Sequence, residues 1–141
     1  MPVKVFIDTN VFIYAFEFPN SNSALIIEHL NKGELQVVVS ELVVNEVMRY
    51  FKKYYCKDLA SKFRDYLIQS CGIVLRAETA ECMRAMKGVI KNKDLEHLAT
   101  VKVLGLKYLI SHDEDFLGQE EFITPKGFVT KMGWRCKKTE F

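Results

Sequence analysis

The chain has 141 residues, of which 49% are hydrophobic and 27% are charged, and its formal net charge is +2. These values are typical of a soluble globular protein with a proper hydrophobic core, and they exclude a disordered or fibrous chain. No apolar stretch approaches the roughly 20 residues that cross a bilayer, so we expect no membrane association. We expect one domain over residues 1–141, located in the cytoplasm, because the strand-like N-terminus does not resemble a signal peptide.

The first half of the chain alternates strand and helix patterns. A run of β-branched and aromatic residues at 3–7 predicts a short buried strand that ends at Asp8. Apolar periodicity and cap residues then define the following elements. In order, we expect a helix at 11–16, a helix from Asn20 or Ser21 to Asn31, a buried strand at 35–39, and a helix at 41–55 capped by Ser40.

The second half continues this alternation. In order, we expect a helix at 57–70, a strand at 73–75, a helix at 78–91, a helix at 94–104 stopped by Gly105, a strand at 108–110, a short strand at 122–123, and a final short helix begun by Thr124 and Pro125. Strands that alternate with helices predict an α/β domain with a parallel sheet and right-handed crossovers.

Cysteine and histidine do not form a zinc pattern. The four cysteines lack any CxxC pairing, and the three histidines are scattered along the chain. We expect free thiols in a reducing compartment, although a bridge between Cys71 and Cys82 stays open.

Acidic residues stand at positions where a parallel sheet places its sites. Asp8 and Asp113 each follow a predicted strand, and the carboxyl ends of parallel strands meet at one edge of the sheet. Glu46 interrupts an apolar helix, where an unpaired charge is costly. Taken singly, each acid has an ordinary alternative: Asp8 and Asp94 could be helix caps, and the run from Asp113 to Asp115 could be a solvated turn.

Together these carboxylates predict a metal site. Clustered carboxylates repel one another unless a cation neutralises them. Oxygen ligands without cysteine or histidine favour Mg²⁺ or Mn²⁺, which can activate water and stabilise charge on a phosphoryl oxygen. Basic residues also gather in segments 49–64 and 122–141. This arrangement suits a polyanionic substrate, although solvated helix faces explain the basic residues equally well.

At these positions the chain resembles the PIN-domain family of metal-dependent ribonucleases. The similar segments are Val-Phe-Ile-Asp-Thr-Asn at 5–10, Glu46 in the helix after Ser40, Asp-Leu-Glu-His-Leu-Ala at 94–99, and Leu-Ile-Ser-His-Asp-Glu-Asp-Phe at 109–116. Their order and spacing extend over nearly the whole chain.

The resemblance implies a three-layer Rossmann-like fold with four to five parallel strands in the order 3-2-1-4-5. It also implies that Asp8, Glu46, Asp94 and Asp113 are catalytic and hold one or two Mg²⁺ or Mn²⁺ ions. Asp113 and Asp115 both match the place of the fourth acid, so that assignment stays open. Asn10 and Ser111 match polar positions that orient the carboxylates and bound water. Many small members are VapC-type toxins restrained by an antitoxin, and many form homodimers.

We therefore expect an endoribonuclease that hydrolyses RNA phosphodiester bonds, with Asp8 and Asp94 orienting the attacking water and with a possible antitoxin partner. Three alternatives remain: a non-catalytic module that binds RNA or protein, an RNA-processing nuclease in a larger assembly, and phosphotransfer through an aspartyl-phosphate. The last generally needs a second acid two residues after the first, where this chain has Asn10, and a lysine that the sequence does not place. His112, beside Asp113, could aid catalysis or simply be a surface imidazole.

Overall fold

A computed structural model describes residues 2–141, and its centre is a five-stranded, all-parallel sheet. The strand order is β3-β2-β1-β4-β5, as expected. The strands are β1 (Val3–Ile7), β2 (Leu35–Ser40), β3 (Gly72–Val74), β4 (Leu109–Ile110) and β5 (Phe122–Ile123). The chain reverses its direction of travel across the sheet between β1 and β4, which are hydrogen-bonded neighbours. A crevice at the carboxyl ends of these two strands is the expected place for a site.

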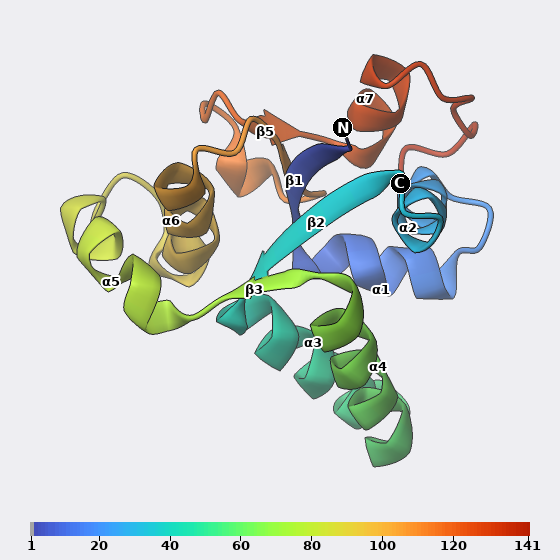
Figure 1. Cartoon of the computed structure of the whole chain (residues 1–141), viewed down its shortest axis with the longest axis horizontal. Helices are drawn as coiled ribbons and strands as arrows, with labels where there is room; N and C mark the ends of the chain where they lie inside the picture. The colour runs from blue at the N-terminus through green and yellow to red at the C-terminus, as the bar shows by residue number, and fades with distance from the viewer. Residues whose placement is uncertain (1) are drawn as a thin grey trace.

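Helices cover both faces of the sheet (Figure 1). Helices α5 and α6 lie on one side and α2 and α7 on the other, while α3 and α4 project beyond the end of the sheet where the strands finish. The helices are α1 (Thr9–Glu17), α2 (Asn22–Asn31), α3 (Glu41–Tyr54), α4 (Lys57–Ser70), α5 (Arg76–Ala85), α6 (Leu95–Leu104) and α7 (Pro125–Lys131), with short 3₁₀ turns at Asn92–Asp94 and Glu114–Phe116. The expected three-layer fold is confirmed.

Strand β1 is the middle of the hydrophobic core. Its last three residues, Val5, Phe6 and Ile7, have no exposed surface. Phe6 is in register with Val38 of β2 and Leu109 of β4, so both neighbouring strands are fixed against it. The burial of apolar side chains on both faces explains why the sequence there is a continuous apolar run rather than an alternating pattern. This packing fixes the position of the residue that follows, Asp8.

Cap residues set the helix boundaries much as the sequence predicts. Ser21, Ser40 and Thr124 each accept a hydrogen bond from the backbone N–H three residues on, and Pro125 occupies the first turn of α7. Gly105 ends α6 in the left-handed conformation, with φ of 61°. The cap of α3 matters most here, because it orients the helix that carries Glu46.

The expected helix at 78–91 is wrong at both ends. Helix α5 begins at Arg76 and stops at Ala85, and residues 86–91 form a turn closed by a bridge between Lys87 and Ile90. Gly88 has φ of 92°, a conformation incompatible with a continuing helix. Met86 and Ile90 pack against the core from this turn, so apolar residues four positions apart occur here without a helix. Strand β3 also lies one residue earlier than expected.

Within residues 2–141, no helix has the length and apolar character needed to span a membrane. All four cysteines are free thiols, so the bridge between Cys71 and Cys82 is absent. Burial raises the pKa of the Cys71 thiol to about 12, which makes it unreactive.

Candidate metal centre

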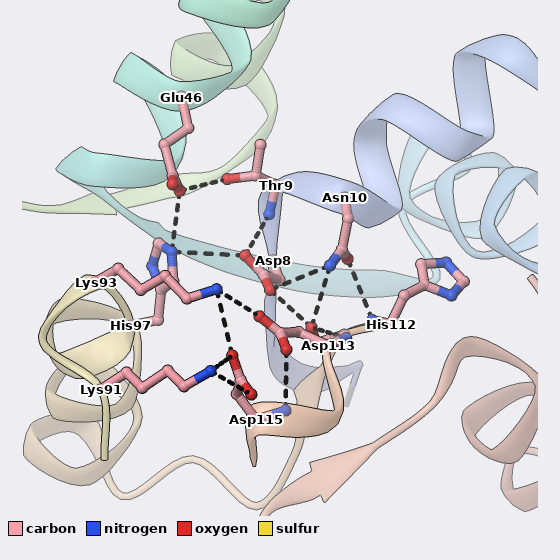
Figure 2. A network of polar contacts seen from close by, with 11 residues as sticks. Asp8, Thr9, Asn10, Glu46, Lys91, Lys93, His97, His112, Asp113 and Asp115 are labelled. Atoms are coloured by element: carbon pink, nitrogen blue, oxygen red, sulfur yellow. Dashed lines mark hydrogen bonds and ion pairs between the residues drawn. The ribbon is translucent and has the colours of Figure 1, made fainter. Parts of the chain in front are cut away.

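The predicted acids come together at the carboxyl edge of the sheet, and Figure 2 shows Asp8, Glu46, Asp113 and Asp115 there. Asp8 follows β1 and Asp113 lies three residues beyond β4, so the two lie at the neighbouring strand ends where the crevice is expected. Glu46 reaches the same place from α3, and Asp94 from the 3₁₀ turn before α6. Oxygen or nitrogen atoms of Asp8, Glu46 and His97 all lie within 4.8 Å of one another, and so do oxygens of Asp94, Asp113 and Asp115.

Asp8 is held rigidly in a buried position. It is 5% exposed, and its Oδ1 accepts a hydrogen bond of 2.7 Å from the backbone N–H of Thr9. The residue therefore does cap α1, as the simpler alternative proposed, but its second oxygen faces the site. Oδ2 accepts a bond of 2.6 Å from Ser111 Oγ and a longer one of 3.5 Å from Asn10 Nδ2. Burial raises the pKa of Asp8, since it disfavours the charged form.

Asn10 and Ser111 connect the ends of β1 and β4. Asn10 Nδ2 donates to Ser111 Oγ at 3.4 Å, and Asn10 Oδ1 accepts from the backbone N–H of His112 at 3.2 Å. Ser111 Oγ also accepts from the backbone N–H of Asp113 at 2.9 Å. The two residues expected to orient the carboxylates thus contact Asp8 directly and fix the loop that carries Asp113.

His97 is a member of the site that the sequence analysis missed. Its ring is 2% exposed; Nε2 lies 3.0 Å from Glu46 Oε1 and 3.5 Å from Asp8 Oδ1, and Nδ1 lies 3.0 Å from Ser40 Oγ. Burial opposes a charge on the ring, but the hydrogen bond to Glu46 and the surrounding carboxylates outweigh it and raise the pKa of His97. His97 stands three residues after Asp94, the spacing that places two side chains on one helix face, and this spacing was the available signal.

Glu46 is fixed from two sides. Its Oε1 accepts a hydrogen bond of 2.8 Å from Thr9 Oγ1 in addition to the contact with His97. Partial burial works to raise the pKa of Glu46, but the hydrogen bond and charge of His97, aided by Thr9 and Arg49, lower it overall. Glu46 is therefore ionised at neutral pH and paired, as expected for an acid in an apolar helix.

Asp94 is the least satisfied residue of the site. It stands in the N-cap position of α6 but makes no side-chain cap bond, so the helix-cap alternative does not explain it. Its Oδ2 is buried and has no hydrogen-bond partner among the described residues. The only comparable oxygen there belongs to Glu121, whose other oxygen pairs with Lys102. Burial raises the pKa of Asp94 to about 6, and the charges of Asp113 and Asp8 add to the effect.

Two lysines also lie at the acids. Lys93 Nζ is 3.2 Å from Asp115 Oδ2 and 3.5 Å from Asp113 Oδ2, and Lys91 Nζ is 3.1 Å from Asp115 Oδ1. The sequence does not place these lysines, and they pair with Asp113 and Asp115 rather than with Asp8. By contrast, Lys131 of the C-terminal basic segment lies near Lys107 and Tyr108, at the opposite end of β4 from the acids. Segment 49–64 contributes a charge to the site through Arg49, which lowers the pKa of Glu46.

This arrangement fits a divalent cation. The candidate ligands form two groups of three, Asp8 with Glu46 and His97, and Asp94 with Asp113 and Asp115. Carboxylate oxygens predominate and no thiol is present, a donor set that suits Mg²⁺ or Mn²⁺. The unpartnered oxygen of Asp94 supports such a site, because a buried carboxylate oxygen without a donor is costly until a cation, a water or a proton satisfies it. Asp113 and Asp115 both lie within reach of Asp94, so both remain candidates for the fourth acid.

Comparison with known proteins gives the family of this chain. The family model described as PIN domain matches residues 5–119, which include all the acids of the site. The chain belongs to the PIN-domain family. No curated protein matches this PIN domain.

Solved structures with the same fold include proteins of toxin–antitoxin systems. A toxin–antitoxin complex from Klebsiella pneumoniae is 26% identical to this PIN domain, with a TM-score of 0.69 over 86% of this chain and 97% of that chain. VapBC2 from Rickettsia felis, bound to a DNA fragment from its promoter, is 15% identical with a TM-score of 0.61, over 86% and 98% of the two chains. PAE2754 from Pyrobaculum aerophilum is 14% identical with a TM-score of 0.63, over 93% and 90%. The last two are similar in fold alone.

Proposed function

We propose that this PIN domain is a metal-dependent endoribonuclease whose catalytic residues are Asp8, Glu46, Asp94 and Asp113, with Asp115 as a further metal ligand. The observation that carries the proposal is the buried, unpartnered Oδ2 of Asp94, which lies with Asp113 and Asp115 at the same edge of the sheet as Asp8 and Glu46. The fold supports it, because the acids lie at the strand-order reversal between β1 and β4.

The residues of the site have separable roles in phosphodiester hydrolysis. A bound Mg²⁺ or Mn²⁺ supplies Lewis acidity toward the phosphoryl oxygen and eases deprotonation of water. Asp8 and Asp94 would orient the attacking water for in-line approach, and one of them would accept its proton. As the new P–O bond forms, the bond to the leaving oxygen breaks and that oxygen takes up a proton. Asn10 and Ser111 keep the Asp8 carboxylate in place, as their contacts with its Oδ2 allow. No side chain has to form a covalent intermediate, and Asn10 stands where an aspartyl-phosphate enzyme would need its second acid.

We further propose that the protein acts as the toxin of a toxin–antitoxin pair, forms a homodimer and works on RNA in the cytoplasm. The resemblance to the Klebsiella pneumoniae complex supports an antitoxin partner. The four free thiols suit a reducing compartment.

Cleavage of a circular single-stranded RNA tests the activity, because only an endonuclease can open a circle. We expect linear products with Mn²⁺ or Mg²⁺ and none with EDTA. A pool of cellular RNA run in parallel covers the possibility that one sequence is preferred. If calorimetry shows Mn²⁺ binding but neither RNA is cut, the protein is a binding module and the proposed activity is wrong.

His112 should be dispensable for cleavage. Its ring points away from the acids (Figure 2), accepts or donates a hydrogen bond of 2.9 Å with Ser23 and packs edge-on against Tyr14. Burial lowers the pKa of His112 to about 4, so the ring is neutral at pH 7. We expect His112→Ala to reduce the free energy of unfolding by about 1–3 kcal/mol, because it leaves Ser23 unpaired. Cleavage per folded molecule should not change. A urea titration run beside the assay gives the fraction of the variant that is unfolded. A loss of cleavage larger than this fraction would give His112 a catalytic role.

A further inference from the structure

Lys91 and Lys93 contact the acidic site, yet the proposed function does not use them. Both precede α6: Lys91 immediately before the 3₁₀ turn at Asn92–Asp94 and Lys93 within it. Figure 2 shows Lys93 between the carboxylates of Asp113 and Asp115, and Lys91 against the carboxylate of Asp115. The lysine side chains are 65% and 62% exposed, whereas Asp115 and Asp113 are 27% and 25% exposed. The two ammonium groups therefore cover these carboxylates from the outside.

These ion pairs are of the kind that another cation can displace. Exposed pairs between lysine and a carboxylate contribute little to stability, because water screens them and both side chains lose rotamer freedom. Lys93 also shares its single charge between Asp113 Oδ2 and Asp115 Oδ2, at 3.5 and 3.2 Å. A divalent ion on Asp94, Asp113 and Asp115 would neutralise the same charges at shorter range. The lysines would then lose their carboxylate partners.

The displaced lysines would remain at the site. The backbone of the 3₁₀ turn carries Asp94 as well as Lys93, so a cation held by Asp94 keeps the lysine within reach of whatever the cation binds. A phosphodiester backbone presents the same kind of acceptor as a carboxylate, and lysine binds phosphate as a flexible point charge with three donors. RNA at the acidic site would thus find two ammonium groups ready for its phosphates.

We propose that Lys91 and Lys93 are substrate-positioning residues that exchange the carboxylates of Asp113 and Asp115 for RNA phosphates when the site takes up its cation. The inference rests on the proposed function. On this inference, Lys91 and Lys93 neutralise the carboxylates in the metal-free protein and contact RNA phosphates once the cation and the RNA are bound.

The first arm of the test measures Mn²⁺ binding by calorimetry without RNA. Lys93→Met and Lys91→Met should bind Mn²⁺ more tightly than the parent, because each removes a competing cation. Lys87→Met is the matched control, since Lys87 is an exposed lysine of the same segment and loses the same charge without touching the acids. Its Mn²⁺ affinity should equal that of the parent. Circular dichroism checks that all the variants are folded.

The second arm measures the binding of a labelled single-stranded RNA of mixed sequence, with Ca²⁺ in place of Mn²⁺. A gel run afterwards checks that the RNA is still intact. Each lost phosphate contact should reduce the slope of log affinity against log salt by about 0.7. We expect this reduction for Lys93→Met and for Lys91→Met, and no change for Lys87→Met.

Both arms have to succeed. Tighter Mn²⁺ binding with an unchanged salt slope would make the lysines counter-ions only. A reduced salt slope with unchanged Mn²⁺ affinity would show that no exchange occurs. Either result overturns the inference. Failure confined to these variants leaves the proposed nuclease intact. If the parent itself binds no Mn²⁺, the proposed function fails and the inference falls with it.

Discussion

Replacement of Asp8 by asparagine should abolish RNA cleavage and leave the protein at least as stable as the parent. Asp8 faces the site with Oδ2 and approaches His97 with Oδ1. Asparagine keeps the shape of the side chain but offers only one acceptor oxygen and no negative charge. The loss in rate should be at least about two orders of magnitude, the range found when one electrostatic group is removed from a preorganised site.

The stability of the Asp8→Asn variant should stay the same or rise, although its cleavage is lost. Burial raises the pKa of Asp8, so the ionised carboxylate costs the folded state free energy at neutral pH. Asparagine removes that cost and still accepts the hydrogen bond from Thr9 that caps α1. Thermal unfolding of the metal-free variant should therefore occur at the same temperature as in the parent, or higher. Asp65→Asn, an exposed change of the same kind on α4, is the control for both measurements. Full cleavage by the Asp8→Asn variant would remove Asp8 from the mechanism.

Addition of Mg²⁺ or Mn²⁺ should stabilise the protein, and the gain should grow with pH. A ligand that binds only the folded state at a hundred times its dissociation constant contributes about 2.7 kcal/mol. The raised pKa of Asp94, about 6, means that the folded metal-free protein holds a proton there which the unfolded chain has already lost. The stability due to this proton is present at low pH and is lost as pH rises through 6. Metal binding replaces the proton, so the two effects have opposite pH dependence.

The measurement is the difference in free energy of unfolding with and without metal, at about pH 5 and about pH 7.5. At the lower pH the ion has to displace a proton, so its apparent affinity should be about tenfold weaker and the gain about 1.4 kcal/mol smaller. The difference is the right quantity because His112, with a pKa of about 4, titrates in the same window with the opposite sign. The His112 ring pairs with Ser23 rather than with an acid, so its contribution to the free energy of unfolding is the same with and without metal and cancels in the difference. A gain that is equal at both pH values would exclude Asp94 as a ligand.

Sequence patterns predicted the parts of the site that depend on strand ends. The apolar runs before Asp8 and Ser111 identify buried strands, and the polar residues that follow such strands have to lie at the carboxyl edge. Glu46 was predictable for a different reason, because a charge within an apolar helix needs a partner. The strand order came from the family resemblance, since pattern alone does not give the order of parallel strands.

The residues that were missed depend on distances across the fold. His97 lies in α6, but its partners Ser40, Glu46 and Asp8 belong to other elements, and no local pattern connects them. Lys91 and Lys93 were not singled out from the sequence, and the helix expected over 78–91 leads into them. The turn at 86–91 gives this segment a different path, and only the structure shows that the lysines reach Asp113 and Asp115.

The central claim is that the acids at the carboxyl ends of β1 and β4 form a cation site. Manganese soaked into crystals of the protein tests it directly through the anomalous scattering of the metal. The account predicts an anomalous peak at direct coordination distance from Asp94 and at least one of Asp8 and Asp113, with Oδ2 of Asp94 turned toward the ion. A map with no peak at these residues, and with Asp94 paired to a protein donor instead, would contradict it.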